Sequence, residues 1–186
     1  MEINSLTLKQ RKTIADYQRL PEGTPIQLID GEFIMSPSPV RKHQKLIGKL
    51  HLQLGELVES NKLGEVYIAP FDVHMSRNDV YQPDLLFVSN EHLDDIQEDG
   101  VHGPPDLVIE VLSRSTAGFD LLLKKDGYEK FGVKEYWVVD PMDKTIEVFI
   151  NSPNGFVSSF AGKTGTACSS VLPEFCIDVI ALFGAI

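Results

Sequence analysis

The feature that most constrains this chain is a nearly continuous apolar run, Leu107-Val108-Ile109-Glu110-Val111-Leu112, which follows Asp106. A strand of this composition is typical of the centre of a sheet that is covered on both faces. A helical pattern extends from about residue 115 to residue 131, and residues 136–139 form a second apolar run. Strand, helix and strand in this order favour a right-handed parallel crossover, with an antiparallel placement as the alternative. We therefore expect a mixed α/β (α+β) fold organised around these two strands.

The segments around this core carry their own signals. Residues 6–20 have helical spacing, residues 26–29 and 33–35 flank the hairpin signal Asp30-Gly31, and residues 40–60 have a helical apolar stripe. Further strands are expected at residues 66–69, 71–75, 81–88, 145–150 and 156–161, with a polar surface loop at 90–103 and a strand or short helix at 175–183. Ser115 or Thr116 should cap the core helix, and Gly132 should end it. No repeat or linker is visible, so we expect residues 1–186 to form one domain.

Composition and charge limit the classes of function. The 186 residues are 42% hydrophobic and 24% charged, as in a globular protein, and no apolar run approaches the roughly 20 residues of a membrane helix. The net charge of −10 argues against a protein that coats nucleic acid by bulk electrostatics, but it allows a locally basic groove. Arg41, Lys42, Lys45 and Lys49 form either a solvated helix face or a surface that faces DNA.

The cysteines and the first residues of the chain indicate the cellular compartment of the protein. Cys168 and Cys176 are the only cysteines, and their spacing and neighbours do not indicate a metal site. We expect them to be unpaired, as in a reducing compartment. The first residues lack the basic and then apolar pattern of a secretory signal. The sequence therefore favours a cytoplasmic protein.

Glu110 is the most informative residue, because it places a carboxylate inside an apolar strand. An isolated carboxylate there costs several kcal/mol unless it is paired, protonated or bound to a metal. Strand alternation puts Asp106 and Glu110 on the same face. Two interpretations follow: a structural ion pair with a nearby lysine or arginine, or a ligand in a metal site.

Asp84 provides a second carboxylate. It opens another apolar run directly after Pro83, so a neighbouring strand would bring it to Glu110; taken alone, it is equally compatible with a strand-start cap. Two carboxylates with a backbone carbonyl, such as that of Val111, would suit Mg²⁺, with Mn²⁺ as a substitute, because these ions take oxygen ligands. Coordination positions would remain for a phosphate and a nucleophilic water.

Phosphodiester hydrolysis also needs a cation near the attacking water or the developing negative charge. Lys124 and Lys125 in the following helix are the candidates, and a solvated surface lysine is the alternative for each. Lys124 lies one turn after Asp120 and one turn before Tyr128, so these three share a helix face. Lys125 would point roughly 100° away.

An ordered set of short motifs is similar to one known family. The set comprises Ile29-Asp30-Gly31-Glu32, Ser36-Pro37, His43, Pro83-Asp84, Pro105-Asp106 through Glu110 to Ser113, Asp120, Lys124, Tyr128, Gly132-Val133, Glu135-Tyr136-Trp137 and Asp140-Pro141. With these residues the chain resembles, over about residues 28–183, the Uma2 family (DUF820) of bacterial restriction endonucleases. That family belongs to the PD-(D/E)XK nuclease superfamily.

The resemblance implies a restriction-endonuclease-like core, a mixed central sheet flanked by helices. It also implies Asp84 and Glu110 as the catalytic, metal-binding acids. The superfamily places a lysine two residues after the second acid, but this chain has Leu112 there. The family pattern implies Lys124 as the replacement, reaching the site from the neighbouring helix.

Four further residues are candidates of second rank. Glu32 would complete the metal shell or orient a water, and His43 would contact phosphate or only cap its helix. Asp106 is either a site residue or a strand-start residue, and Tyr128 shares the face of Lys124.

The leading functional hypothesis is a Mg²⁺-dependent endonuclease that hydrolyses phosphodiester bonds in DNA, acting as a homodimer. One alternative is a catalytically inactive nuclease fold that serves as a binding or assembly module. Another is a metal-dependent hydrolase of small phosphorylated molecules, which would need a confined pocket. The C-terminal segment Ile180-Ala181-Leu182-Phe183 would supply either a dimer interface or core.

Overall fold

The computed structural model describes residues 10–36, 38–113 and 119–184, with the backbone alone at residues 119–122. Within these ranges the chain forms two six-stranded sheets and a two-stranded C-terminal sheet, together with helices. The fold is thus mixed α+β, as predicted. None of the described helices has the length and apolar character needed to cross a membrane.

The main sheet has the two predicted core strands at its centre. Its order is β12-β11-β10-β9-β6-β3, formed by β3 (Gly64–Ile68), β6 (Leu85–Ser89), β9 (Leu107–Val111), β10 (Glu135–Asp140), β11 (Thr145–Ser152) and β12 (Gly155–Gly162). β9 and β10 are parallel, and the other neighbours are antiparallel. With α3 (Phe119–Phe131) between them, β9 and β10 confirm the parallel strand–helix–strand prediction. Gly132, with a φ of 90°, ends α3; the predicted caps Ser115 and Thr116 lie outside the described residues.

The second sheet consists of short strands. Its order is β2-β1-β5-β4-β8-β7, formed by β1 (Ile26–Ile29), β2 (Glu32–Met35), β4 (Val73–Ser76), β5 (Asp79–Tyr81), β7 (Ile96–Gln97) and β8 (Gly100–Val101). The hairpin of β1 and β2 is confirmed, and its turn residues Asp30 and Gly31 have φ values of 49° and 75°. The expectation of a surface loop at residues 90–103 is wrong in part, because the segment contains a 3₁₀ helix, η1 (Asn90–Asp95), and the paired strands β7 and β8, of which β8 is buried.

One strand prediction is wrong. Residues 81–88 do not form a single strand, because β5 ends at Tyr81 in the second sheet and β6 begins at Leu85 in the main sheet. The chain changes sheets at Gln82-Pro83-Asp84, where Pro83 has no N–H with which to continue a ladder. This change of sheets places Asp84 directly before β6, in the segment that connects the two sheets.

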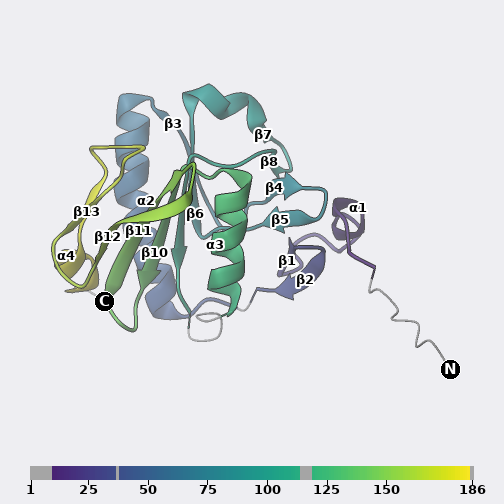
Figure 1. Ribbon diagram of the computed structural model, residues 1–186, viewed down its shortest axis with the longest axis horizontal. Coiled ribbons are helices and arrows are strands. Elements are labelled where there is room, and N and C mark those ends of the chain that lie inside the picture. Colours follow the sequence, from purple (N-terminus) through teal and green to yellow (C-terminus); the bar gives the residue numbers. More distant parts are fainter. Residues whose placement is uncertain (1–9, 37, 114–118, 185–186) are drawn as a thin grey trace.

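Successive residues along the strands of the main sheet belong to two hydrophobic clusters, one on each face of the sheet. Leu107 and Ile109 belong to the cluster on the side of α2 (Arg41–Asn61), whereas Val108 belongs to the cluster that contains Tyr128 of α3. Figure 1 shows α2 and α3 on opposite sides of the main sheet. Because side chains alternate along a strand, Glu110 shares the face of Val108 and points toward α3.

Helix α2 matches its prediction closely. The predicted range was 40–60, and Leu46, Leu50 and Leu54 are buried along the predicted stripe. Of the basic residues on this helix, Lys42 and Lys45 are exposed. Lys49 donates a 2.8 Å hydrogen bond to the carbonyl of Leu182.

The N-terminal helix is shorter than the predicted range 6–20. The described helix α1 (Ile14–Tyr17) has four residues, and residues 1–9 lie outside the described part. Asp16 and Thr13 form a capping box, in which the Thr13 amide donates to the Asp16 carboxylate at 3.0 Å.

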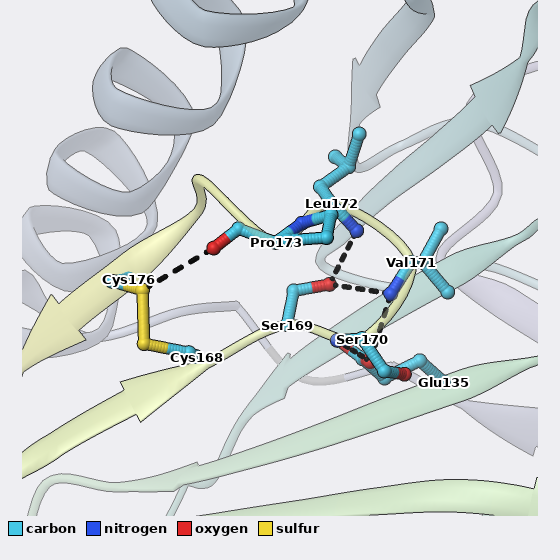
Figure 2. The surroundings of a disulfide bond; sticks show 8 residues. All are labelled: Glu135, Cys168, Ser169, Ser170, Val171, Leu172, Pro173 and Cys176. Atoms are coloured by element: carbon cyan, nitrogen blue, oxygen red, sulfur yellow. Dashed lines mark hydrogen bonds between the residues drawn. A yellow bond between two sulfur atoms is a disulfide. The ribbon is translucent and has the colours of Figure 1, made fainter.

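The C-terminal region contains β13 (Thr166–Cys168), β14 (Cys176–Asp178) and α4 (Val179–Gly184). Here the expectation of unpaired cysteines is wrong: Cys168 and Cys176 form a disulfide, shown in Figure 2. The two residues are direct partners on antiparallel strands, with Cα atoms 4.1 Å apart, so the strand pairing brings the sulfurs together. Of the C-terminal apolar segment, Leu182 and Phe183 lie in the core and Ile180 is exposed.

Candidate functional site

The pairing of β6 with β9 brings the two predicted acids together. Leu86 pairs with Val108 and Leu85 with Ile109, so one further step along this antiparallel register places Asp84 beside Glu110. The amide of Val111 donates a 2.8 Å hydrogen bond to Oδ2 of Asp84, which fixes this carboxylate against β9. The Asp84 carbonyl in turn accepts from the amide of Ala69 at 3.1 Å. Asp84 is therefore held between two chain segments.

Glu110 has the charged partner that its burial demands. Its Oε1 accepts hydrogen bonds from Nζ of Lys124 at 2.8 Å and from the Tyr128 hydroxyl at 2.7 Å. Lys124 and Tyr128 are four residues apart on α3, so one helix face supplies both donors, as the sequence predicted. The side chains of Glu110 and Lys124 are only 10% and 11% exposed. The contact is thus the ion pair that the first interpretation predicted. It is also compatible with the metal-site interpretation, because Glu110 lies beside Asp84 and Lys124 lies beside Glu110.

His43 joins the site from the first turn of α2. Its Nε2 lies 3.1 Å from Oδ2 of Asp84, which also accepts the amide of Val111. Burial opposes protonation, but Asp84, Glu110 and the Val111 carbonyl together raise the pKa of His43 above its usual value. These contacts place His43, Asp84 and the Val111 carbonyl in one group.

The electrostatics of the site follow from burial. Burial raises the pKa of Glu110, the Asp84 charge raises it further, and Lys124 opposes both effects. Burial and the charge of Glu110 likewise raise the pKa of Tyr128 well above its usual value. Tyr128 is therefore a hydrogen-bond donor to Glu110 at neutral pH, as its 2.7 Å contact requires.

These residues line a cleft of about 960 Å³ between the two sheets and the start of α2. Its lining includes Asp84, Glu110, Val111, His43 and Lys124. The cleft opens past apolar side chains, among them Met35 and Ile68, which are 71% and 44% exposed. A substrate could therefore reach the carboxylates from solvent.

Two candidates of second rank lie elsewhere. Glu32 is exposed at the start of β2, whereas the end of that strand, Ile34 and Met35, lines the cleft. The structure therefore does not bring Glu32 to the carboxylates.

Asp106 precedes β9, at the opposite end of the strand from Glu110, and lines a different pocket. It pairs with Lys134 at 2.6 Å and with His92 at 3.0 Å, and it accepts from the Ser89 amide. Burial alone would raise the pKa of Asp106, but His92, Lys134 and Ser89 lower it to about 2. Asp106 thus stabilises the fold away from the cleft.

The structure also shows where Lys125, the alternative lysine, and Leu112, at the family's usual lysine position, lie. Nζ of Lys125 lies over the ring of Phe149, 3.8 Å from its centroid, so it points away from Glu110 as predicted. Leu112 lines the cleft but offers no charge. Lys124 is the lysine that contacts Glu110, at 2.8 Å. Of its predicted face-mate Asp120, the backbone alone is described.

The donor set fits a Mg²⁺ ion. Among the described residues, the hydrogen bonds use Oδ2 of Asp84 and Oε1 of Glu110, and no described donor contacts the other oxygen of either carboxylate. Two carboxylate oxygens and the Val111 carbonyl are hard oxygen ligands of the kind that Mg²⁺ takes together with water. The residues present are therefore compatible with the ion that the sequence predicted.

Sequence reasoning missed two residues of this cleft, His74 and Asp99. They are 25 residues apart and carry no spacing motif. The pairing of β4 with β8 and the turn that follows β7 bring them together. A strand was expected at residues 71–75, but residues 90–103 were expected to form a loop, so β7 and β8 were not predicted.

Comparison with known proteins agrees with this architecture. A family model described as "Uma2: Putative restriction endonuclease" matches residues 14–179. A solved structure from Anabaena variabilis, titled "Crystal structure of a putative nuclease belonging to DUF820", is similar, with a TM-score of 0.77 and 20% sequence identity. The match covers 92% of this chain and 97% of that one, and at this identity it establishes the fold. No match was found among curated proteins. The chain belongs to the Uma2 family of restriction-endonuclease-like proteins.

Proposed function

We propose that this protein is a Mg²⁺-dependent endonuclease that hydrolyses phosphodiester bonds in DNA. The observation that carries the proposal is the meeting of Asp84, Glu110 and Lys124 in one cleft, with Nζ of Lys124 2.8 Å from Glu110. The family match to nucleases supports the reaction class. Asp84, Glu110 and the Val111 carbonyl would hold Mg²⁺ or Mn²⁺.

Each side chain has a separate task in this proposal. The bound metal would polarise a phosphoryl oxygen and lower the pKa of a water. The Lys124 ammonium has three donors and gives one to Glu110, its hydrogen-bond partner among the described residues. The other two would serve an attacking water and a phosphate oxygen. Tyr128 and His43 hold the two carboxylates in position through Oε1 of Glu110 and Oδ2 of Asp84.

The surface beside the cleft favours a polymeric phosphate over a small one. Arg41, Lys42 and Lys45 are exposed in the first turns of α2, next to His43, although the net charge of the chain is −10. The N-terminus of a helix also carries partial positive charge. A DNA backbone that lies along this end of α2 would place successive phosphates on these cations while one phosphodiester enters the cleft.

A cleavage assay on supercoiled plasmid and labelled duplex DNA, with Mg²⁺ or Mn²⁺, tests the function. Asp84→Asn and Glu110→Gln should abolish cleavage, and Lys124→Met should lower the rate by about 10²–10³-fold. The matched controls are Lys125→Met and Asp143→Asn, since Lys125 contacts Phe149 and Asp143 is exposed and paired with Lys163. Full activity in Glu110→Gln would contradict the assignment. Absence of wild-type cleavage, with metal bound, would favour a binding module.

One metal site cuts one strand, so we propose a homodimer for double-strand cleavage; sedimentation velocity that shows monomer on duplex DNA would contradict it.

We also propose that the protein is cytoplasmic, because the DNA that it would cleave is found in that compartment. The Cys168–Cys176 disulfide bears against that location because cytosolic disulfides are rare. Free thiols at both positions in freshly isolated protein would support the cytoplasm.

A further inference from the structure

A second group of metal-ligating side chains lies at the rim of the cleft, on strands of the second sheet. β4 and β8 are parallel neighbours in which Val73 pairs with Val101. The residues that follow, His74 and His102, are therefore also neighbours on one side of the sheet. Their rings stack with centroids 4.4 Å apart and planes at 19°. The register of two short strands thus builds a histidine pair.

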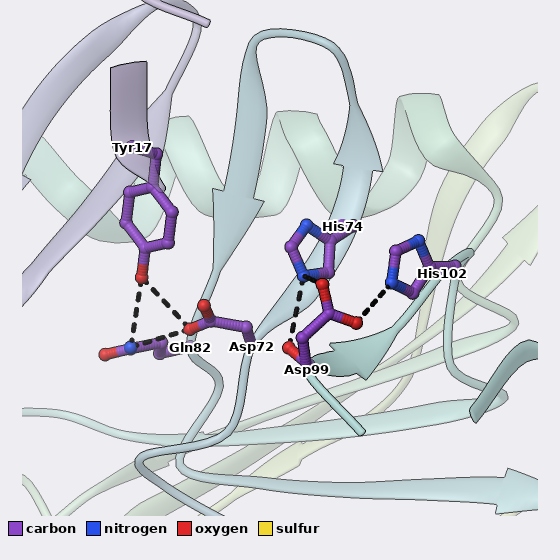
Figure 3. A network of polar contacts seen from close by, with 6 residues as sticks. All are labelled: Tyr17, Asp72, His74, Gln82, Asp99 and His102. Carbon is purple, nitrogen blue, oxygen red and sulfur yellow. Dashed lines mark hydrogen bonds and ion pairs between the residues drawn. The ribbon is translucent and has the colours of Figure 1, made fainter. Parts of the chain in front are cut away.

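Asp99 completes the group from the turn between β7 and β8. Its Oδ1 lies 2.8 Å from Nε2 of His102, and its Oδ2 lies 3.8 Å from Nε2 of His74. Taking one ligand atom from each residue, the three atoms lie within 4.8 Å of one another. Figure 3 shows one nitrogen atom of each ring facing Asp99.

The backbone that carries Asp99 is fixed in place. Gly100 has a φ of 136°, and a Cβ atom there would lie 2.3 Å from the carbonyl oxygen of Asp72. That carbonyl accepts the amide of Val101 at 2.9 Å. The Asp72 carboxylate is itself held by the Tyr17 hydroxyl at 3.0 Å and by Gln82 at 2.8 Å (Figure 3). The turn that presents Asp99 is therefore positioned before any ligand arrives.

One ring nitrogen of His74 has no hydrogen-bond partner among the described residues. Its side chain is 5% exposed, and Nδ1 is buried without a hydrogen bond to any described residue. Nε2, on the other edge of the ring, faces Asp99, with 3.2 Å to its carbonyl oxygen. A metal ion would therefore bind this ring through Nε2, on the edge that faces Asp99, and Nδ1 would carry the proton of the neutral imidazole.

We propose that His74, Asp99 and His102 form a Zn²⁺ site, separate from the Asp84–Glu110 pair. Zinc takes imidazole nitrogen and carboxylate oxygen ligands at about 2.0–2.2 Å, which in tetrahedral geometry sets ligand atoms about 3.3 Å apart. Nε2 of His102 lies 2.8 Å from Oδ1 of Asp99, and Nε2 of His74 lies 3.8 Å from Oδ2. These separations, one to each oxygen of the carboxylate, fall on either side of that value. The ion would replace the hydrogen bond between Asp99 and His102.

Three protein ligands leave a fourth position for water or a substrate oxygen. His74 and Asp99 also line the cleft that contains Asp84 and Glu110, so this position would be open to the same substrate. The side chains of Asp99 and His102 are 53% and 36% exposed, so the ion can enter from solvent. The site does not depend on the proposed nuclease activity.

The test measures Zn²⁺ binding by calorimetry and the visible absorption of Co²⁺ in its place. Both are carried out in the Glu110→Gln background, which disables the other metal site. We expect one equivalent to bind, and His102→Ala or Asp99→Asn to weaken it by at least about 100-fold, since even second-shell changes cost 10–100-fold. His51→Ala is the matched control, because His51 lies on α2 outside the group. Circular dichroism verifies that each variant is folded.

Three results would overturn the proposal. The first is absence of stoichiometric Zn²⁺ binding in the Glu110→Gln protein. The second is unchanged affinity and an unchanged Co²⁺ spectrum in both His102→Ala and Asp99→Asn. The third is an equal loss of binding in His51→Ala, which would identify adventitious histidine binding. Loss in the two cluster variants alone would establish the site.

Discussion

Nζ of Lys124 lies 2.8 Å from Oε1 of Glu110, although one residue belongs to a helix and the other to a buried strand of the main sheet. The strand supplies a charge that burial disfavours, and the helix that follows it supplies the countercharge. The pair therefore connects the stability of the core to the chemistry proposed for the cleft. Unfolding experiments measure its contribution to stability, and cleavage and metal-binding assays measure its contribution to the chemistry.

Removing one partner should cost more than removing both. Lys124→Met leaves Glu110 as an unpaired buried charge, so we expect a loss of about 3–5 kcal/mol in the free energy of unfolding at pH 7. The double variant Glu110→Gln/Lys124→Met removes both charges and should lie within about 1 kcal/mol of the wild type. Urea unfolding measures both. Lys125→Met is the control, and additive losses in the double variant would contradict the coupling.

The Tyr128 hydroxyl should contribute a charge-assisted hydrogen bond. Tyr128→Phe removes its 2.7 Å contact with Glu110 and should lower the free energy of unfolding by about 1.5–3 kcal/mol. Tyr136→Phe is a matched control in the same hydrophobic cluster, because the Tyr136 hydroxyl is buried without a partner among the described residues. Its removal should be neutral or stabilising. Equal losses in the two variants, measured by urea unfolding, would refute this role of Tyr128.

Asp106 should make stability depend on acid pH without affecting the cleft. Its pKa is about 2 in the folded protein, below the ordinary 3.8, so its stabilisation is complete above pH 3.8 and is lost as the pH falls through about 2. The difference corresponds to at most about 2 kcal/mol, because Lys134 is half exposed and screened by solvent. Asp106→Asn should lack this loss.

Unfolding titrations of wild type and Asp106→Asn between pH 2 and pH 6 provide the measurement. Asp106→Asn should also keep wild-type affinity for Mn²⁺, since Asp106 lines a different pocket. Identical pH profiles for the two proteins would show that Asp106 does not carry the effect.

The disulfide should stabilise the C-terminal sheet and leave the chemistry unchanged. Cys168 and Cys176 are eight residues apart, so the closed loop predicts a loss of about 2–3 kcal/mol on reduction. Thiol titration before and after reduction, combined with urea unfolding, measures it. The Cys168→Ala/Cys176→Ala variant should keep wild-type metal affinity; a matching loss of affinity would link this sheet to the cleft.

Local patterns predicted the parts of the fold that depend on local physics. Asp30-Gly31 predicted a turn because both residues need positive φ, and the stripe of α2 predicted its buried face. The apolar run around Glu110 predicted the central strand, and the cost of its buried charge predicted either an ion pair with a lysine or arginine or a metal site. The family resemblance then indicated Lys124, which contacts Glu110. These signals lie within one element or between consecutive elements.

Features that depend on pairing between distant short strands could not be predicted in this way. The run at residues 81–88 looks continuous, but Pro83 separates strands of two different sheets. The disulfide depends on the register of β13 and β14, and β13 has only three residues. The group of His74, Asp99 and His102 likewise depends on the pairing of β4 with β8, which no periodic pattern in the sequence predicts.

The measurement that tests the central claim most directly is Mn²⁺ binding by calorimetry to the wild type, Asp84→Asn and Glu110→Gln. It does not depend on choosing the right DNA substrate, and a short duplex can be added to complete the coordination shell. We expect one equivalent bound by the wild type and lost in both variants, with affinity unchanged in Asp143→Asn, whose exposed carboxylate pairs with Lys163. Wild-type affinity in Asp84→Asn and Glu110→Gln, with and without DNA, would contradict the assignment of this pair as the metal site.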